Sequence, residues 1–183
     1  MIGSTRSLAE IGLKYYLTHQ SERVAILAAE LNREHFAADT TGNNTHYRRV
    51  QQLQRQLTLN YQSQVTRWAL FLLKSSGLIS DPLLKRELEL TYLDFLGNQG
   101  DKAQINLIIN KQIAVEKKFA VFRPQWGDQQ VSNQFLKHIL DTTYNEEELV
   151  AAWRAGGQIG EVVGPDLLEL VKLRNKMARQ QGY

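Results

Sequence analysis

The sequence is poor in residues that break helices and contains no cysteine. Without cysteine it can form no disulfide, no cysteine-ligated zinc or iron–sulfur site and no thiol nucleophile. Only 3 prolines and 12 glycines occur in 183 residues, which argues against a β-sandwich or a barrel. No uninterrupted apolar run is longer than the six residues of 68–73, far short of the roughly 20 residues that span a membrane. These absences favour a helical protein with no membrane-spanning segment.

The net charge is also small, and the distribution of charged residues identifies no partner. The formal net charge is +3, and the basic residues gather only mildly, at Lys172, Arg174, Lys176 and Arg179. These four fall in the last turns of a predicted helix, where cations favour the negative end of the helix dipole. We therefore interpret them as a solvated helix face and predict no nucleic-acid partner.

The N-terminal stretch is unlike a secretory signal. Glu10 and Lys14 interrupt the segment after Arg6, so an apolar region of about 7–15 residues is missing. From this pattern and the short apolar runs we expect a cytoplasmic protein with no membrane partner.

What the chain does contain is a large share of apolar and helix-favouring residues. It is 43% hydrophobic and rich in leucine and glutamine, enough for a hydrophobic core. We predict an all-α fold of long antiparallel helices in a bundle-like array, with one short loop or hairpin-like excursion near 123–131. A single helical domain is expected over 1–183, with a long-helix bundle at 1–122 and the excursion and shorter helices at 123–183.

Two long helices are expected at the start of this domain. The first covers 4–38, with the polar patch at 18–22 either a break or an exposed turn, and a turn follows at 40–44. The second is expected as one continuous helix over 45–76, because apolar residues recur there at steps of three or four. The predicted stripes are Leu8, Ile11, Tyr15, Val24, Leu27, Ala28, Leu31 and His35–Phe36 in the first helix, and Tyr47, Val50, Leu53, Leu57, Tyr61, Val65, Trp68 and Leu72 in the second. Such helices predict an antiparallel hairpin.

Capping residues predict where the later helices start. The caps are Asp81 (before Pro82), Asp101, Ser132 and Asn145, the last with Glu148 in a capping-box pattern. The final helix is expected to start at Pro165 and to end at Gly182, with an inner stripe of Leu168, Val171, Arg174–Asn175 and Ala178. Of the three tryptophans, we expect Trp68 and Trp153 in the core and Trp126 exposed.

No local motif predicts an active site. The histidines His19, His35, His46 and His138 form no HExxH, and only His19–Glu22 and His138–Asp141 have spacing that could share a helix face. We interpret both pairs as surface pairing or capping, with metal ligation as the alternative. The glycine-rich segment 156–160 follows no predicted strand, so it is read as a helix junction and not as a phosphate loop. We predict no catalytic, cofactor-binding or metal residue.

Several segments, taken in order, resemble one enzyme family. They are Asp81-Pro82-Leu83-Leu84, 95–99 (FLGNQ), 116–119 (EKKF), Val131-Ser132, 152–155 (AWRA), 158–160 (QIG) and 170–178 (LVKLRNKMA) followed by Gly182-Tyr183. This set resembles the N-terminal helical region of zinc metallopeptidases of the oligoendopeptidase F, thimet oligopeptidase and angiotensin-converting enzyme group. The resemblance covers most of the chain, and its ending is the most specific part.

The resemblance implies a helical body that forms a wall or lid over a peptide channel. In that family two histidines of HExxH and a distant glutamate hold zinc, and the HExxH glutamate activates water. Those residues lie C-terminal to the region resembled here, so the resemblance assigns zinc to the full-length family and no cofactor or catalytic role to this chain. It implies peptide substrates for the complete enzyme and packing against the catalytic half.

Two other hypotheses remain open at this stage. The chain could be a free-standing, non-catalytic helical interaction module, in which case we expect an exposed apolar strip or a homodimer that buries it. It could also be a helical enzyme or metal carrier that uses His19, His35 or His138.

Overall fold

The computed structural model describes residues 2–182, and the side chains from residue 8 onward. Within these residues it contains eight helices and one two-stranded hairpin, which confirms the predicted all-α, bundle-like fold. The elements are α1 (Ile2–Thr41), α2 (Asn44–Asn60), α3 (Gln64–Ser75), α4 (Pro82–Gly97), α5 (Lys102–Val121), β1 (Gln125–Trp126), β2 (Gln129–Gln130), α6 (Asn133–Thr142), α7 (Glu146–Gly157) and α8 (Ile159–Gln180).

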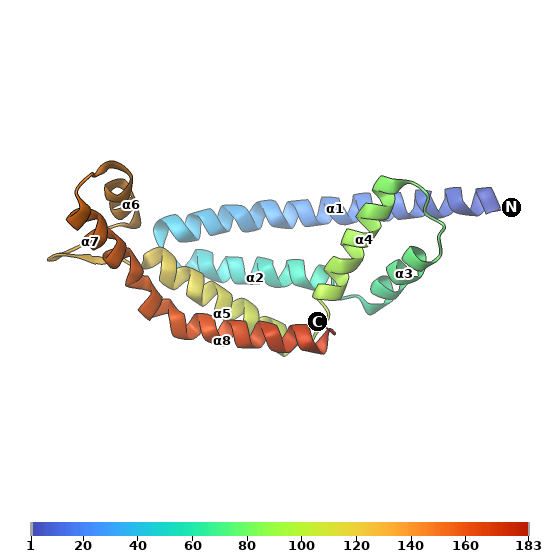
Figure 1. Ribbon diagram of the computed structural model, residues 1–183. Coiled ribbons are helices and arrows are strands. Elements are labelled where there is room, and N and C mark those ends of the chain that lie inside the picture. Colours follow the sequence, from blue (N-terminus) through green and yellow to red (C-terminus); the bar gives the residue numbers. More distant parts are fainter. Residues whose placement is uncertain (1, 183) are drawn as a thin grey trace.

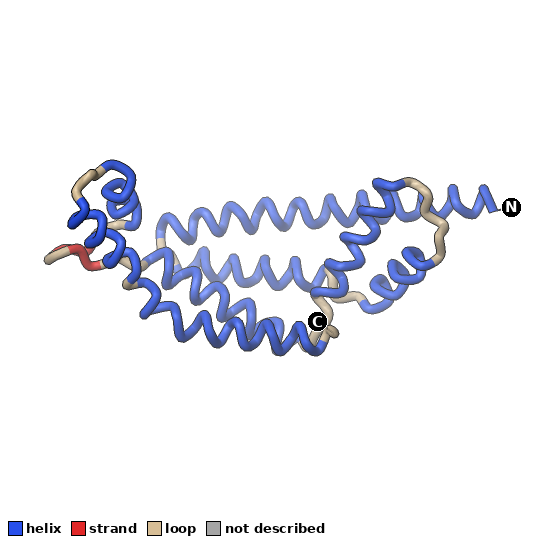
Figure 2. The backbone as a smooth tube through the Cα atoms, in the orientation of Figure 1, coloured by secondary structure: helices blue, strands red, loops and turns tan. Residues whose placement is uncertain are grey.

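The helices form an elongated array (Figures 1 and 2). Helices α1, α2, α5 and α8 lie along the long axis, and the consecutive neighbours in this order pack against one another. Helices α3 and α4 lie towards the end where the chain begins, and α6, α7 and the hairpin lie at the opposite end. Helix α1 runs along most of the array, so the predicted antiparallel hairpin of the first two helices is present as α1 and α2.

Side-chain caps start the helices where the sequence predicts them. The carboxylate of Asp81 accepts hydrogen bonds from the backbone N–H groups of Leu83 and Leu84, at 2.8 and 3.0 Å. Asn43, Asp101, Ser132 and Asn145 act in the same way. The pattern at Asn145 is not a reciprocal capping box, because the Glu148 carboxylate accepts instead from the Thr143 hydroxyl at 2.8 Å.

The core is divided into three clusters along the array. The largest joins α1, α2 and α5 through Leu31, Ala38, Tyr47, Val50, Leu53, Ile105, Ile109 and Ile113. A second joins α1, α3 and α4 with the loop between α3 and α4 through Leu13, Leu17, Leu70, Ile79, Leu88 and Phe95. A small third cluster, Leu136, Ala152 and Ala155, holds α6 to α7, with Trp126 of the hairpin packed against it.

The predicted continuous helix over 45–76 is wrong, because the chain breaks at 61–63. Tyr61 closes α2 through its N–H to Thr58 O, and the Ser63 hydroxyl accepts from Thr66 N–H at 3.2 Å to start α3. The predicted stripe splits at this break. Its first part is buried in α2, whereas Val65 in α3 is 81% exposed. Trp68 and Leu72 are exposed as well, so the core position predicted for Trp68 is also wrong.

The first helix is unbroken, and its N-terminal half turns a different side to the core. The patch at 18–22 stays helical, with Gln20 buried. The predicted stripe residues Leu8, Ile11 and Tyr15 are exposed, and the helix packs through Leu13 and Leu17 instead. The reason is that α3 and α4 lie against that side of α1, which the spacing of apolar residues could not indicate.

The last helix also departs from the prediction. It begins at Ile159, before Pro165, after the junction that was expected at Gly156-Gly157. The predicted inner residues Leu168 and Val171 are exposed, and α8 packs on α5 through other positions, including Val163 and Leu170.

The two remaining tryptophans are exchanged relative to the prediction. Trp153 is 75% exposed, whereas Trp126 is half-buried beside Phe135, with ring centroids 6.2 Å apart. The hairpin that carries Trp126 is the expected excursion, and Gly127 makes its turn with a φ of 56°. Pairing of β1 with β2 thus folds this loop back, and Trp126 packs against the cluster that joins α6 to α7.

Candidate functional site

The two histidine–carboxylate pairs singled out in the sequence, His19–Glu22 and His138–Asp141, lie on single helices and make local contacts there. Within residues 2–182 no group of three or more His, Asp or Glu side chains could hold a metal ion. The His19 ring lies over Tyr15, with centroids 4.0 Å apart, and its Nδ1 is 2.9 Å from Tyr15 O. In the second pair, Asp141 accepts a hydrogen bond from Lys137 Nζ at 2.6 Å. Each pair is therefore engaged in local contacts on its own helix.

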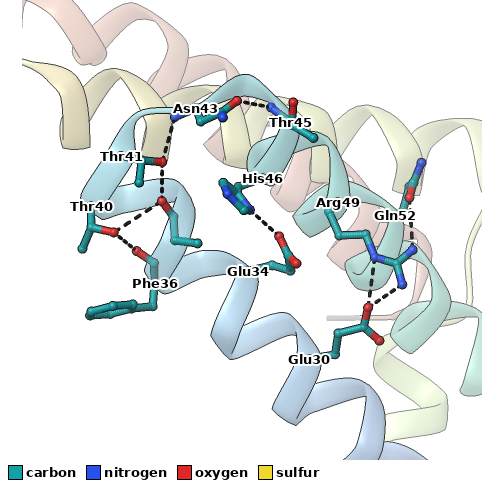
Figure 3. A network of polar contacts seen from close by, with 11 residues as sticks. Glu30, Glu34, Phe36, Thr40, Thr41, Asn43, Thr45, His46, Arg49 and Gln52 are labelled. Carbon is teal, nitrogen blue, oxygen red and sulfur yellow. Dashed lines mark hydrogen bonds and ion pairs between the residues drawn. The ribbon is translucent and has the colours of Figure 1, made fainter.

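The remaining histidines do not come together either. His46 Nδ1 lies 2.7 Å from Glu34 Oε2, which links α2 to α1 (Figure 3). His35 is half-buried on α1. One turn before Glu34 on α1, the carboxylate of Glu30 accepts a hydrogen bond from Arg49 Nε at 3.0 Å. These two partly exposed pairs hold α2 against α1. Pairs of this kind each contribute about 0.2–1 kcal/mol to stability.

A second polar network joins α5 to α8. Lys111 Nζ lies 3.0 Å from Asp166 Oδ1 and also pairs with Glu169, while Lys118 pairs with the other oxygen of Asp166. Hydrogen bonds from Lys118 and Lys111 hold the pKa of Asp166 below its usual value, and the hydrogen bonds to Glu169 and Asp166 raise the pKa of Lys111. The network is a structural tie, because all its acids are neutralised by neighbouring cations.

Burial raises the pKa of several tyrosines, but none lies beside a nucleophile or metal ligand. Burial, and then the nearby Asp39 carboxylate, raise the pKa of Tyr47 to about 12. The Tyr47 hydroxyl donates to Asp39 Oδ1 at 3.2 Å. Desolvation likewise raises the pKa of Tyr61 and of Asp94. Burial therefore favours the neutral form of each of these groups within the helix array.

Exposed apolar surfaces distinguish this structure more than its polar networks do. Between α1 and α3 lies a groove of about 310 Å³, lined by Leu8, Ala9, Gly12, Leu13, Tyr16, Thr66, Ala69, Leu70 and Leu73. None of these lining residues is charged. The exposed side chains of Tyr15, Val65 and Leu72 belong to the same two helices. An uncharged groove flanked by helices with exposed apolar side chains is typical of a contact with another protein segment.

A second apolar groove lies at the opposite end, between α6 and α7. It has a volume of about 380 Å³ and is lined by Asn133, Leu136, Lys137, Leu140, Ala152, Trp153, Gly156 and Gly157. The indole of Trp153 is largely exposed here. Large exposed aromatic side chains are characteristic of interface cores.

Helix α8 carries exposed apolar side chains of its own. Gly164, Leu168, Val171, Asn175 and Ala178 follow one another at steps of three or four and therefore share one side of the helix. None of the five is charged, and Leu168 is 63% exposed. Lys172, Lys176 and Arg179 lie beside Asn175 at the C-terminal end of the helix. The charged residues that tie α8 to α5 lie on other sides of the helix. This uncharged side, which we call the α8 face, is available for packing.

Sequence reasoning missed the grooves and the α8 face, although it named many of their residues. Leu8, Leu168, Val171 and Trp153 had been predicted as core because they lie on apolar stripes. One signal in the sequence could have identified them. The leucine-rich helices carry apolar residues on more than one side, and only one side can face a single neighbouring helix, so the other stays exposed.

Within the described residues, no helix combines the length and the apolar character that crossing a membrane requires. Comparisons with protein-family models, with curated proteins and with solved structures found no match to this chain.

Proposed function

We propose that this chain is the N-terminal helical portion of a zinc-dependent oligopeptidase. In this proposal it forms a wall or lid of the peptide channel and carries no catalytic group of its own. The zinc ligands and the water-activating glutamate belong to a catalytic half that packs against it. A cytoplasmic location is part of the same proposal, and cell fractionation tests it.

The α8 face is the observation that carries the proposal. The segment of the sequence that most resembles the peptidase family, 170–183, lies mainly in α8. In this helix Leu168 and Val171 are exposed, and the residues in line with them, Gly164, Asn175 and Ala178, are uncharged. Burying two such side chains against a further domain would contribute roughly 1.5–3 kcal/mol each at full burial. An uncovered apolar helix face therefore fits a chain that packs against a catalytic half.

The gene supplies the decisive test. We expect the reading frame to continue beyond the codon for Tyr183 and to encode HExxH. A stop codon directly after Tyr183, with no HExxH in the frame, would overturn the proposal. Where the motif is present, the complete protein should cleave quenched-fluorescent oligopeptides in a zinc-dependent manner, and the chain 1–183 alone should not.

A double variant then tests the role of the α8 face in the complete protein. Leu168→Asp with Val171→Asp should lower peptidase activity, because two carboxylates cannot be buried unpaired against the catalytic half. Lys176→Asp, also on α8 but on a different side, is the matched control and should retain activity. Equal activity of the double variant and the control would contradict the proposed packing.

The groove between α1 and α3 supports one alternative, a free-standing interaction module that forms a homodimer. It lies at the end of the array away from α6 and α7, so a second copy could cover it without involving the α8 face. Multi-angle light scattering of the chain at tens of micromolar distinguishes the two. Leu8 lines the groove and is 70% exposed. A dimer that Leu8→Asp converts to a monomer would favour the module, and a monomer at all concentrations would count against it.

A further inference from the structure

One cavity in the array is polar and lies between two of the long helices. It has a volume of about 250 Å³ and opens between the C-terminal end of α2 and the start of α5. Its lining consists of Arg55, Thr58, Leu59, Gln62, Lys102, Ile105 and Asn106. We call it the α2–α5 pocket. It is separate from the apolar grooves and from the α8 face.

Each of the two helices contributes one basic residue to the α2–α5 pocket, and no lining residue is acidic. Arg55 projects from α2 and Lys102 from the first turn of α5. Helix α2 contains no Asp or Glu, and the first acidic residue of α5 is Glu116, nearly four turns beyond Lys102. Asp101 is next to Lys102, but its carboxylate caps α5 by accepting from Gln104 N–H at 2.9 Å. The positive end of the α5 dipole adds to the same field.

Two buried polar atoms of the lining residues have no hydrogen-bond partner. They are Nε of Arg55 and Oε1 of Gln62. The Arg55 guanidinium is held in place by its Nη2, which donates to Asn110 Oδ1 at 2.6 Å. Buried donors of charged groups are rarely left without an acceptor. Both atoms are inaccessible from the pocket, so an oxyanion there would be held instead by the terminal nitrogens of Arg55, the Lys102 ammonium and the Asn106 amide, which all belong to lining residues.

We propose that the α2–α5 pocket binds a small oxyanion, a phosphate or a carboxylate. Arg55 provides charge-assisted hydrogen bonds in a fixed orientation, and Lys102 provides a second, mobile positive charge. The volume suits a free anion or the anionic end of a larger molecule. The site does not depend on the peptidase proposal, since neither Arg55 nor Lys102 belongs to the segments that resemble the family.

Titration with sodium phosphate and with sodium acetate, at ionic strength held constant with sodium chloride, tests the site. We expect at least one of the two anions to raise the melting temperature saturably and to shift the side-chain amide NMR signals of Gln62 and Asn106. Saturation by phosphate alone assigns a phosphate group, and saturation by acetate assigns a carboxylate. No saturable change with either anion overturns the proposal.

Three variants separate binding in the pocket from general screening of charge. Arg55→Gln and Lys102→Gln should each weaken the apparent affinity by about tenfold or more. Arg48→Gln is the matched control, because it removes the same charge from the same side of α2 two turns earlier, outside the pocket. If Arg55→Gln does not fold, Lys102→Gln decides, since the Lys102 side chain is exposed. Equal affinity in Lys102→Gln and Arg48→Gln overturns the proposal.

Discussion

The orientation of α8 makes a sharp prediction about two leucines that lie two residues apart. Leu170 is 3% exposed and packs within the array, whereas Leu168 is 63% exposed. We expect Leu170→Ala to reduce the free energy of unfolding by about 2–5 kcal/mol, as for other buried leucines. Leu168 is only about one-third covered. Full burial of a leucine contributes roughly 1.5–3 kcal/mol, so Leu168→Ala should cost about 0.5–1 kcal/mol.

Urea denaturation followed by circular dichroism at 222 nm measures both values under the same conditions. Similar slopes of the free energy against urea would show that the variants unfold the same structure. Because the sequence alone predicts Leu168 on the inner stripe, the order of the two effects separates the two orientations of α8. If Leu168→Ala costs as much as Leu170→Ala or more, the packing of α8 described above is wrong.

Three further outcomes are expected. The pKa of Tyr47 is raised to about 12, so the neutral phenol is favoured in the folded state, and the stability that depends on it should be lost as the pH rises from about 10 through 12. Tyr47→Phe should flatten this decline in urea unfolding, and an unchanged decline would contradict the assignment. The lowered pKa of Asp166 has the opposite sign, so its contribution should be present above about pH 4 and lost as the pH falls below it. Asp166→Asn should flatten the decline of the free energy of unfolding below about pH 4. A decline as steep as in the unmodified protein would refute the role given to Lys111 and Lys118. Finally, the chain 1–183 purified on its own without chelator should contain no stoichiometric zinc by elemental analysis, and one zinc per chain would revive the histidine-based metal hypothesis.

The proposed roles of the surfaces can be separated by experiment. The α8 face and the α1–α3 groove lie on different helices, so their variants report on different contacts. The α2–α5 pocket is polar, and its test depends on the charge of Arg55 and Lys102 and not on apolar burial. A failure of the oxyanion test would therefore leave the peptidase proposal standing. A failure of the peptidase test would likewise leave the oxyanion proposal standing.

The sequence by itself determined the fold class and most helix starts. Asp81, Asp101, Ser132 and Asn145 each cap the helix that they were predicted to start. Capping needs only a side-chain oxygen and backbone N–H groups two or three residues later, so it is readable from a few neighbouring residues. Repeated apolar spacing with few breakers likewise settles that these segments are helices.

Only the tertiary structure decided which side of each helix is buried. In α8 the residues Leu167, Leu168, Leu170 and Val171 surround much of the helix, and the sequence offers no reason to prefer one stripe. Contact with α5 buries Leu170 and leaves Leu168 outside. The break at 61–63 has the same origin: α3 leaves the line of α2 and packs with α4 and α1. Apolar periodicity is a property of one helix, whereas burial depends on where its neighbours lie.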